Sequence, residues 1–127
     1  MAITTRQGFA VSVILASSGY PGSFEKGKTI TVGEVPSGTP IQPLLSSQRL
    51  HSFSDVVVFH AGTVKAKDLV QTSGGRVIAV SAYAPSLQEA LDRAYKGVEQ
   101  VNFDGKVYRR DIAHQYVCQS TVTQCRR

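Results

Sequence analysis

Residues 86–101 carry the strongest pattern in the sequence, because they combine a helix start signal with an apolar stripe of helical spacing. Ser86 stands three residues before Glu89, which is the spacing of a capping box, where each side chain bonds the other residue's backbone N–H. The apolar pattern ends at Asn102, and Gly105 follows it. We therefore predict one main helix here. Its core-facing stripe comprises Leu87, Leu91, Ala94, Val98 and Val101.

Most of the remaining chain consists of β-branched and apolar runs that are separated by Gly and Pro. Residues 9–17 (FAVSVILAS) are typical of a buried strand, and residues 56–64 and 106–112 are also rich in strand-forming residues. Gly74 and Gly75 separate two further β-rich runs, so we predict a two-residue hairpin turn with positive φ at both glycines. Together these patterns predict an α+β fold, in which a mostly antiparallel β-sheet packs against one main C-terminal helix.

Residues 22–29 (GSFEKGKT) fit the nucleotide-binding pattern G-x-x-x-x-G-K-[ST]. A working P-loop needs a strand before the loop and a helix after it, so that backbone N–H groups converge on the phosphates. Residues 30–40 (ITVGEVPSGTP) instead predict a short strand and a loop, because they are β-branched and contain two glycines and two prolines. We therefore interpret the match as a coincidence.

Length and charge limit the possible classes of protein. A chain of 127 residues is long enough for one domain with its own core. The net charge of +5 is spread over a surface where Lys and Arg alternate with acids, which argues against a nucleic-acid partner. No apolar run has the length of a membrane span and the start of the sequence lacks a signal peptide, so we expect no membrane association. Cys118 and Cys125 lack zinc-ligand spacing and are expected to be reduced thiols of an intracellular protein.

The residues capable of chemistry do not form a complete catalytic set in the sequence. His60 follows a predicted strand, where a hydrogen-bonded structural histidine is favoured over a catalytic one. Arg109, Arg110 and Asp111 follow one another at the end of the last predicted strand. Either one arginine pairs with Asp111, which we favour, or it binds an anionic ligand. Spacing alone therefore predicts a globular domain without a complete active site.

Four ordered segments nevertheless resemble one enzyme family. They read GYPGSFEKGKTI, VVVFHAGT, TSGGRVIAVSAYAPSLQEALDRAYKGVEQVNFDG and YRRDI, and they lie within residues 9–114. In this order they are similar to the C-terminal domain of phosphoribosylamine–glycine ligase, also called glycinamide ribonucleotide synthetase. The resemblance implies a cytoplasmic, ATP-dependent ligase of the ATP-grasp type that acts in purine biosynthesis and uses Mg²⁺ or Mn²⁺. In that reaction glycine is activated as glycyl phosphate and is then attacked by the amine of 5-phosphoribosylamine.

The resemblance also implies a division of labour between domains. ATP and metal are expected to bind in the ATP-grasp domains, so this chain should contribute no catalytic residue and no metal ligand, and should be inactive alone. Its expected partners are the ATP-grasp and N-terminal domains of the same enzyme, with glycine and 5-phosphoribosylamine as substrates. The alternative is a stand-alone binding or interaction module that is derived from this domain. The positions carried over, as substrate-cleft lining or interdomain contacts, are Tyr20, Lys26, His60, Gly62, Thr63, Arg109, Arg110 and Asp111.

Several positions depart from the pattern of the family. Ser18 stands where the family has Gly, in a turn where a positive φ would favour glycine, and Val64 stands where a Lys commonly follows HAGT. Residues 39–54 form an irregular insertion in a single domain that spans residues 1–115, and residues 116–127 are expected to be an unstructured tail. We hypothesise a truncated product of a fungal bifunctional gene with translated intron sequence in the insertion and the tail. A transcript colinear with the protein would contradict this hypothesis.

Overall fold

The computed structural model describes residues 3–5, 7–33 and 56–120. The insertion predicted at 39–54 and residues 121–127 of the predicted tail lie outside the described residues. The elements, in chain order, are β1 (Phe9–Ser17), β2 (Thr31–Val32), β3 (Val56–His60), β4 (Thr63–Ala66), β5 (Leu69–Thr72), β6 (Arg76–Ala84), α1 (Leu87–Gln100), β7 (Val101–Asn102), β8 (Lys106–Tyr108) and α2 (His114–Ser120).

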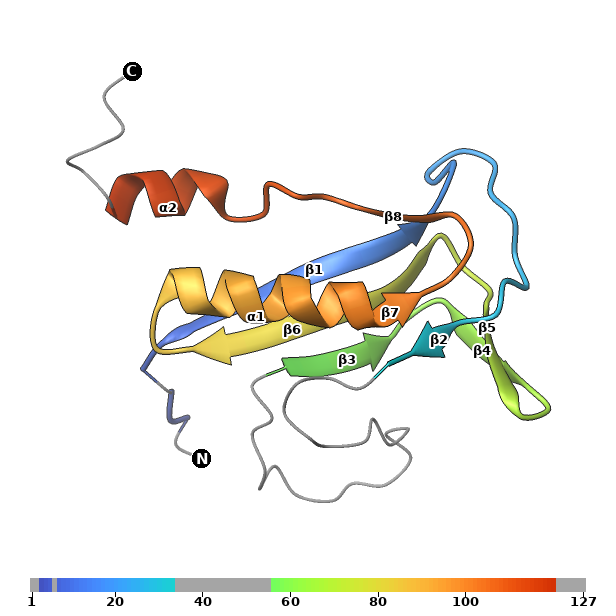
Figure 1. The fold of residues 1–127 in the computed structure, drawn as a ribbon, viewed down its shortest axis with the longest axis horizontal. Helices are drawn as coiled ribbons and strands as arrows, with labels where there is room; N and C mark the ends of the chain where they lie inside the picture. Colours follow the sequence, from blue (N-terminus) through green and yellow to red (C-terminus); the bar gives the residue numbers. More distant parts are fainter. Residues whose placement is uncertain (1–2, 6, 34–55, 121–127) are drawn as a thin grey trace.

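The main sheet has four strands in the order β3-β6-β1-β8, and every neighbouring pair is antiparallel. Its two long central strands, β1 and β6, pair from Phe9 opposite Ala84 to Ala16 opposite Arg76, with a register shift between Leu15 and Ala16. Helix α1 lies across one face of this sheet (Figure 1). The predicted α+β fold, an antiparallel sheet with one main helix, is therefore confirmed.

Helix α1 forms where its capping signal and apolar stripe predict it. The Ser86 side chain accepts a hydrogen bond from the backbone N–H of Glu89 at 3.3 Å, which satisfies one of the donors left free at a helix start. At the other end, the Lys106 ammonium donates to the carbonyl oxygens of Val98 at 3.2 Å and Val101 at 2.8 Å. A cation at this end also suits the helix dipole. The buried side chains under the helix are Val11, Val13, Leu15, Val58, Val80 and Ala82 from the sheet, with Ala90, Leu91, Ala94 and Val98 from the helix.

The opposite face of the sheet, which we call the open face, carries apolar side chains that remain exposed. Alternation along each strand sends neighbouring side chains to opposite faces, so the residues between the core positions point away from α1. Ile14, Val57, Phe59 and Val107 on this face are 44%, 39%, 46% and 50% exposed. Ile14 and Phe59 both pair with Ala79, so one row of apolar side chains crosses three strands.

The hairpin predicted at Gly74 and Gly75 is wrong. The strands that flank these glycines, β5 and β6, belong to different sheets, and neither glycine has a positive φ. The hairpin partner of β5 is β4, through a tight connection in which Ala66 pairs with Leu69. Lys67 in that connection has a φ of 56°. The glycine pair therefore does not form the turn of a hairpin, and Gly75 instead leaves room for the ring of Tyr20.

The predicted unstructured tail is wrong for residues 116–120, which belong to α2. Val117 of this helix, together with the preceding Ile112 and Ala113, packs against the core cluster and is partly buried. Burial of these three side chains stabilises the segment. The mostly polar sequence of residues 116–120 did not indicate this packing. The departure at Ser18 is also accommodated, because the positive φ in this turn falls on Gly19, at 95°, and not on Ser18.

Candidate functional site

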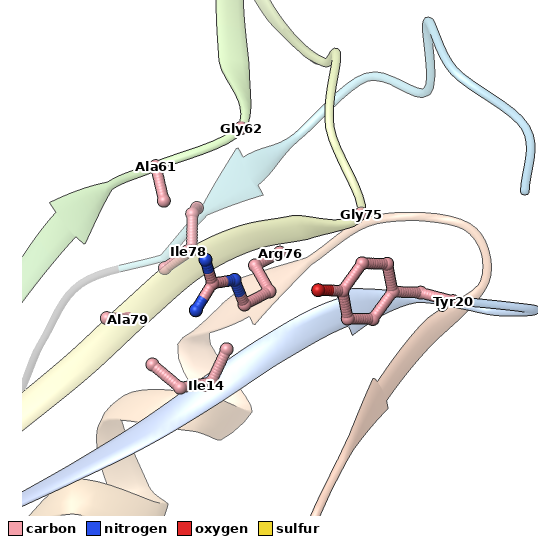
Figure 2. A pocket seen from close by; sticks show the side chains of 8 residues that line it. All are labelled: Ile14, Tyr20, Ala61, Gly62, Gly75, Arg76, Ile78 and Ala79. Atoms are coloured by element: carbon pink, nitrogen blue, oxygen red, sulfur yellow. The ribbon is translucent and has the colours of Figure 1, made fainter. Parts of the chain in front are cut away.

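A cleft of about 590 Å³ lies at one end of the main sheet. It sits where the chain leaves β3, where β6 begins, and beside the loop that follows β1 (Figure 2). The volume falls in the range of small-molecule sites. The residues that line the cleft are Ile14, Tyr20, Ala61, Gly62, Gly75, Arg76, Ile78 and Ala79.

The glycines of this region allow three chain segments to approach one another closely. A Cβ on Gly75 would lie 1.9 Å from Cδ2 of the Tyr20 ring, which is far inside a van der Waals contact. A Cβ on Gly62 would lie 2.5 Å from the backbone oxygen of Arg76. The backbone N–H of Ser17 also donates to the carbonyl of Gly75 at 2.8 Å. The motifs GYPG, HAGT and SGGR, distant in the sequence, thus build one site.

Four of the eight predicted site residues gather at or beside this cleft. Tyr20 and Gly62 line it, and His60 and Thr63 immediately precede and follow the Ala61–Gly62 pair. The Nδ1 atom of His60 lies 3.2 Å from the hydroxyl oxygen of Thr63, within hydrogen-bond distance. His60 therefore has a hydrogen-bond partner in its own loop, as expected of a structural histidine.

Arg109 and Asp111 form a two-pronged ion pair with each other. The Arg109 guanidinium donates to the two carboxylate oxygens of Asp111 at 2.9 Å and 2.6 Å. The hydrogen bond from Arg109 holds the pKa of Asp111 below its ordinary value, and the hydrogen bond to Asp111 raises the pKa of Arg109. Arg110 lies over the ring of Tyr108, with Cζ 5.8 Å from the ring centroid. These residues do not line the cleft, and the pairing favoured in the sequence analysis is present.

The glycine-rich loop that matches a P-loop has an acidic neighbourhood. The Lys28 ammonium lies 2.6 Å from a carboxylate oxygen of Glu25 and 3.3 Å from one of Asp104, and the hydrogen bond to Glu25, followed by that to Asp104, raises the pKa of Lys28. The chain continues into the short strand β2, as predicted, and not into a helix. Lys26, a predicted site residue, lies over the ring of Phe24 at 5.9 Å from its centroid and does not line the cleft.

The described residues do not fit the ATP and metal that the family resemblance implies. Within this part of the chain, no group of three or more His, Cys, Asp or Glu side chains could hold a metal ion. The lysine of the glycine-rich loop is engaged by two carboxylates, which would repel a phosphate. We therefore assign neither group to the described residues. No helix among the described residues is both long and apolar enough to cross a membrane.

Sequence reasoning missed six of the eight residues that line the cleft, among them its one charged residue, Arg76. It stands directly after the Gly74–Gly75 pair, at the first position of β6. The sequence does show a cation, Arg76, directly after two glycines, which is a pattern found where a backbone and a ligand approach closely. The predicted hairpin turn already explained the glycines, so the pattern was not assigned to a site. Figure 2 shows its side chain within the cleft, between Ile14 and the hydroxyl end of Tyr20.

The fold and the cleft define a one-sided α+β domain, in which a helix covers one face of an antiparallel sheet and a small cleft lies at the end of that sheet. The model of the family described as phosphoribosylglycinamide synthetase, C domain, matches residues 10–115. The chain belongs to this family.

Similar proteins agree with this assignment. The chain is 42% identical over 107 residues to the phosphoribosylamine–glycine ligase of Chlorobaculum tepidum, covering 84% of this chain and 22% of that ligase. It is 40% identical to the bifunctional purine biosynthetic protein PUR2,5 of Pichia angusta, covering 84% of this chain and 12% of that protein. The crystal structure of phosphoribosylamine–glycine ligase from Thermotoga maritima matches with a TM-score of 0.63 and 36% identity, over 82% of this chain and 22% of that one. The chain thus spans about a fifth or less of these relatives.

Proposed function

We propose that this chain acts as the C-terminal domain of an ATP-dependent ligase that joins glycine to 5-phosphoribosylamine in purine biosynthesis. The observation that carries the proposal is the family match over residues 10–115, in a chain that covers 22% of a ligase 42% identical to it. The Arg109–Asp111 ion pair and the His60–Thr63 contact are bonds within the domain, and they support a structural role for these positions. We propose that the domain supplies shape and contacts, and no reacting group, to the reaction.

The open face supports an interdomain role. Ile14, Val57, Phe59 and Val107 place a row of exposed apolar side chains on one side of the sheet. Contiguous exposed apolar surface marks an interaction site in a soluble protein, because leaving it in water costs free energy. We propose that the ATP-grasp and N-terminal domains of the ligase cover this face, and that they bind ATP and Mg²⁺ or Mn²⁺. The isolated chain would then have no ligase activity.

A chimeric ligase tests this proposal. In the Chlorobaculum tepidum ligase, residues 9–114 of this chain would replace the segment that aligns with them. We expect the chimera to form glycinamide ribonucleotide from glycine, ATP and 5-phosphoribosylamine, while this chain alone forms none. A folded chimera without activity would contradict the proposed function, and activity of the pure chain would contradict the expectation that it is inactive alone.

The alternative, a stand-alone interaction module, makes a different prediction for the chain in solution. A domain removed from a larger enzyme should self-associate through its bare open face, and the change Phe59→Glu should abolish that association. An independent module should be monomeric with and without the change. Sedimentation of both forms over a range of concentrations distinguishes the two.

The cellular location and the gene of origin are also proposals. We propose that the ligase acts in the cytoplasm, which fractionation of the source cells would test; an organellar location would contradict it. The origin in a fungal bifunctional enzyme stays a prediction. A transcript that continues from residue 115 into a second enzyme's coding sequence would support it, and one that codes for no second enzyme would contradict it.

A further inference from the structure

Another cleft, which we call the edge groove, lies beside the first half of β1. It has a volume of about 580 Å³, and it is lined by Phe9, Ala10, Val11, Ser12, Leu87, Ile112, Ala113 and Tyr116. Successive side chains of a strand point to opposite faces of its sheet, yet four consecutive residues of β1 line this groove. The groove therefore runs along the edge of the strand, next to its backbone, and not over either face of the sheet.

The edge of β1 on this side has no neighbouring strand over most of its length. Strand β8 pairs only with Leu15, Ala16 and Ser17, at the C-terminal end of β1. In the described part of the chain, no strand pairs with residues 9–14 on that side, while their other side is paired with β6. After β8 the chain leaves β1 and continues to α2 (Figure 1). An unpaired edge presents backbone N–H and C=O groups that can pair with another strand.

Two hydrogen bonds show which backbone groups of β1 face the groove. The N–H of Ser17 donates to the turn before β6, and the N–H of Ser18 donates to the turn before β8, each at 2.8 Å. These directions alternate along a strand, so Ala10 and Ser12 direct their N–H and C=O groups toward the β8 side, where the groove lies. The register shift between β1 and β6 places its extra residue in β6, so the alternation along β1 is not interrupted.

The remaining walls of the edge groove are apolar. Leu87 and Ile112 are partly buried against the core, and Tyr116 of α2 is 64% exposed. No residue that lines the groove is charged. A fitting ligand has hydrogen-bond donors and acceptors along one side, where they meet the edge of β1, and uncharged apolar groups that contact the walls. An extended peptide has both, because its N–H and C=O groups lie along its edges and its side chains alternate between its faces.

We propose that the edge groove binds an extended, uncharged segment of another protein, which pairs with β1 as an additional strand. The unpaired stretch, residues 9–14, has the length of an ordinary strand. A single strand needs only about 4.8 Å beside β1. The sheet of a second copy of this chain fits less well, because Ile112, Ala113 and Tyr116 stand beside the same edge. The groove is separate from the cleft at the start of β6, and its binding needs no ligase activity.

A model peptide, acetyl-Val-Thr-Val-Thr-Val-Thr-amide, tests the strand pairing on this chain. The peptide is uncharged, and its alternate valines can contact Leu87 and Ile112. Followed by NMR, saturating peptide should slow hydrogen exchange of the Ala10 and Ser12 amides by at least about tenfold and leave the Val11 amide, which faces β6, unchanged. The same peptide with every backbone nitrogen methylated donates no hydrogen bonds and should not bind. Equal binding of the two peptides, or no protection of the Ala10 and Ser12 amides, would overturn the proposal.

Two variants with equally exposed side chains test where the peptide lies. Phe9 lines the edge groove, Val64 lies outside it on the β4–β5 hairpin, and both side chains are 48% exposed. Phe9→Ala should weaken peptide binding by about fivefold, because apolar contact is lost, and Val64→Ala should leave the binding unchanged. Equal peptide affinities of the two variants would overturn the assignment of the peptide to this groove.

Two further measurements distinguish other occupants. Protection of the Ala10 and Ser12 amides that rises with the concentration of the chain, without peptide, would mean that a second copy fills the groove. A folded chimeric ligase that does not bind the peptide would mean that another segment of the ligase covers the groove. Either result overturns the proposed partner, whereas peptide binding by both the chain and the chimera supports it.

Discussion

At the scale of single residues, the contact between Gly75 and Tyr20 explains a motif that the sequence alone misassigned. A Cβ on Gly75 would lie 1.9 Å from the Tyr20 ring, so no other residue fits while the ring stays in place. Gly75→Ala should destabilise the fold by about 1–3 kcal/mol, because the ring or the backbone must move. Urea denaturation, with the free energy of unfolding extrapolated to water, measures this effect.

The same contact predicts that the two residues are coupled. In a Tyr20→Ala background the ring is absent, and Gly75→Ala should cost clearly less than it does in the unchanged protein. Equal costs in both backgrounds would show that the glycine is needed for another reason than the ring.

The hydroxyl of Tyr95 connects α1 to the segment after β8. It donates to the carbonyl of Arg109 at 2.9 Å and accepts from the backbone N–H of Ile112 at 3.3 Å. Tyr95→Phe should destabilise the protein by about 1 kcal/mol, because both backbone groups lose their partner. Tyr108→Phe is the matched control: the ring of Tyr108 packs against that of Tyr95, but no described residue is hydrogen-bonded to its hydroxyl. Thermal unfolding that shows equal loss for both variants would contradict this assignment.

The Arg109–Asp111 pair predicts a measurable titration. The pKa of Asp111 lies below its ordinary value of 3.8, mainly because Arg109 donates to it. A depressed carboxyl pKa contributes stability above the ordinary pKa, and this contribution is lost as the pH falls through the lower, folded-state value. Both side chains are exposed, so the effect on total stability is small.

NMR titration of the Asp111 carboxyl carbon follows this pKa directly. Arg109→Gln should raise the pKa of Asp111 toward its ordinary value, whereas Arg110→Gln should leave it low, because Arg110 lies over the Tyr108 ring. The opposite ranking of the two variants would show that Arg110 is the true partner in solution.

At the scale of elements, α1 was predictable because its signals are local. The Ser86–Glu89 spacing and the apolar stripe act within a few residues of each other, and the structure has both the capping bond and the buried stripe. Ser86→Ala should destabilise the protein by about 1 kcal/mol, since the N–H of Glu89 loses its acceptor. Ser86→Asp should keep the cap and the stability. Urea midpoints that are equal for the two variants would contradict the capping role.

Other elements were not predictable, because long-range contacts determine them. The glycines before β6 read as a hairpin turn on local grounds, yet their role depends on Tyr20, more than fifty residues earlier in the sequence. Helix α2 has weak local signals and is held by packing of Val117 against the core. Strand β6 pairs with β1 and β3. The sequence pattern does not determine which of the distant strands are its partners.

For the molecule as a whole, the resemblance to a family predicted the fold, and the division of the predicted positions between cleft lining and interdomain contact stays a prediction. Tyr20 and Gly62 line the cleft, whereas Lys26 and the 109–111 segment do not. Which of these residues lie together depends on which strands are neighbours in the sheet, and the strand order is set by long-range pairing. Arg76 lines the cleft for the same reason: the start of β6 lies beside the loop that follows β1. The sequence pattern does not indicate this proximity.

If the rest of a ligase packs on the open face of the sheet, a charge on that face should lower the activity of the chimeric ligase. Phe59→Glu puts a charge on that face, and Leu69→Glu puts the same charge on an apolar position of the β4–β5 hairpin; Leu69 is 53% exposed and Phe59 is 46% exposed. We expect Phe59→Glu to lower the ligase activity by at least about tenfold, because a buried unpaired charge is costly, and Leu69→Glu to leave the activity unchanged. Full activity of the Phe59→Glu chimera would show that no other domain of the ligase packs on this face.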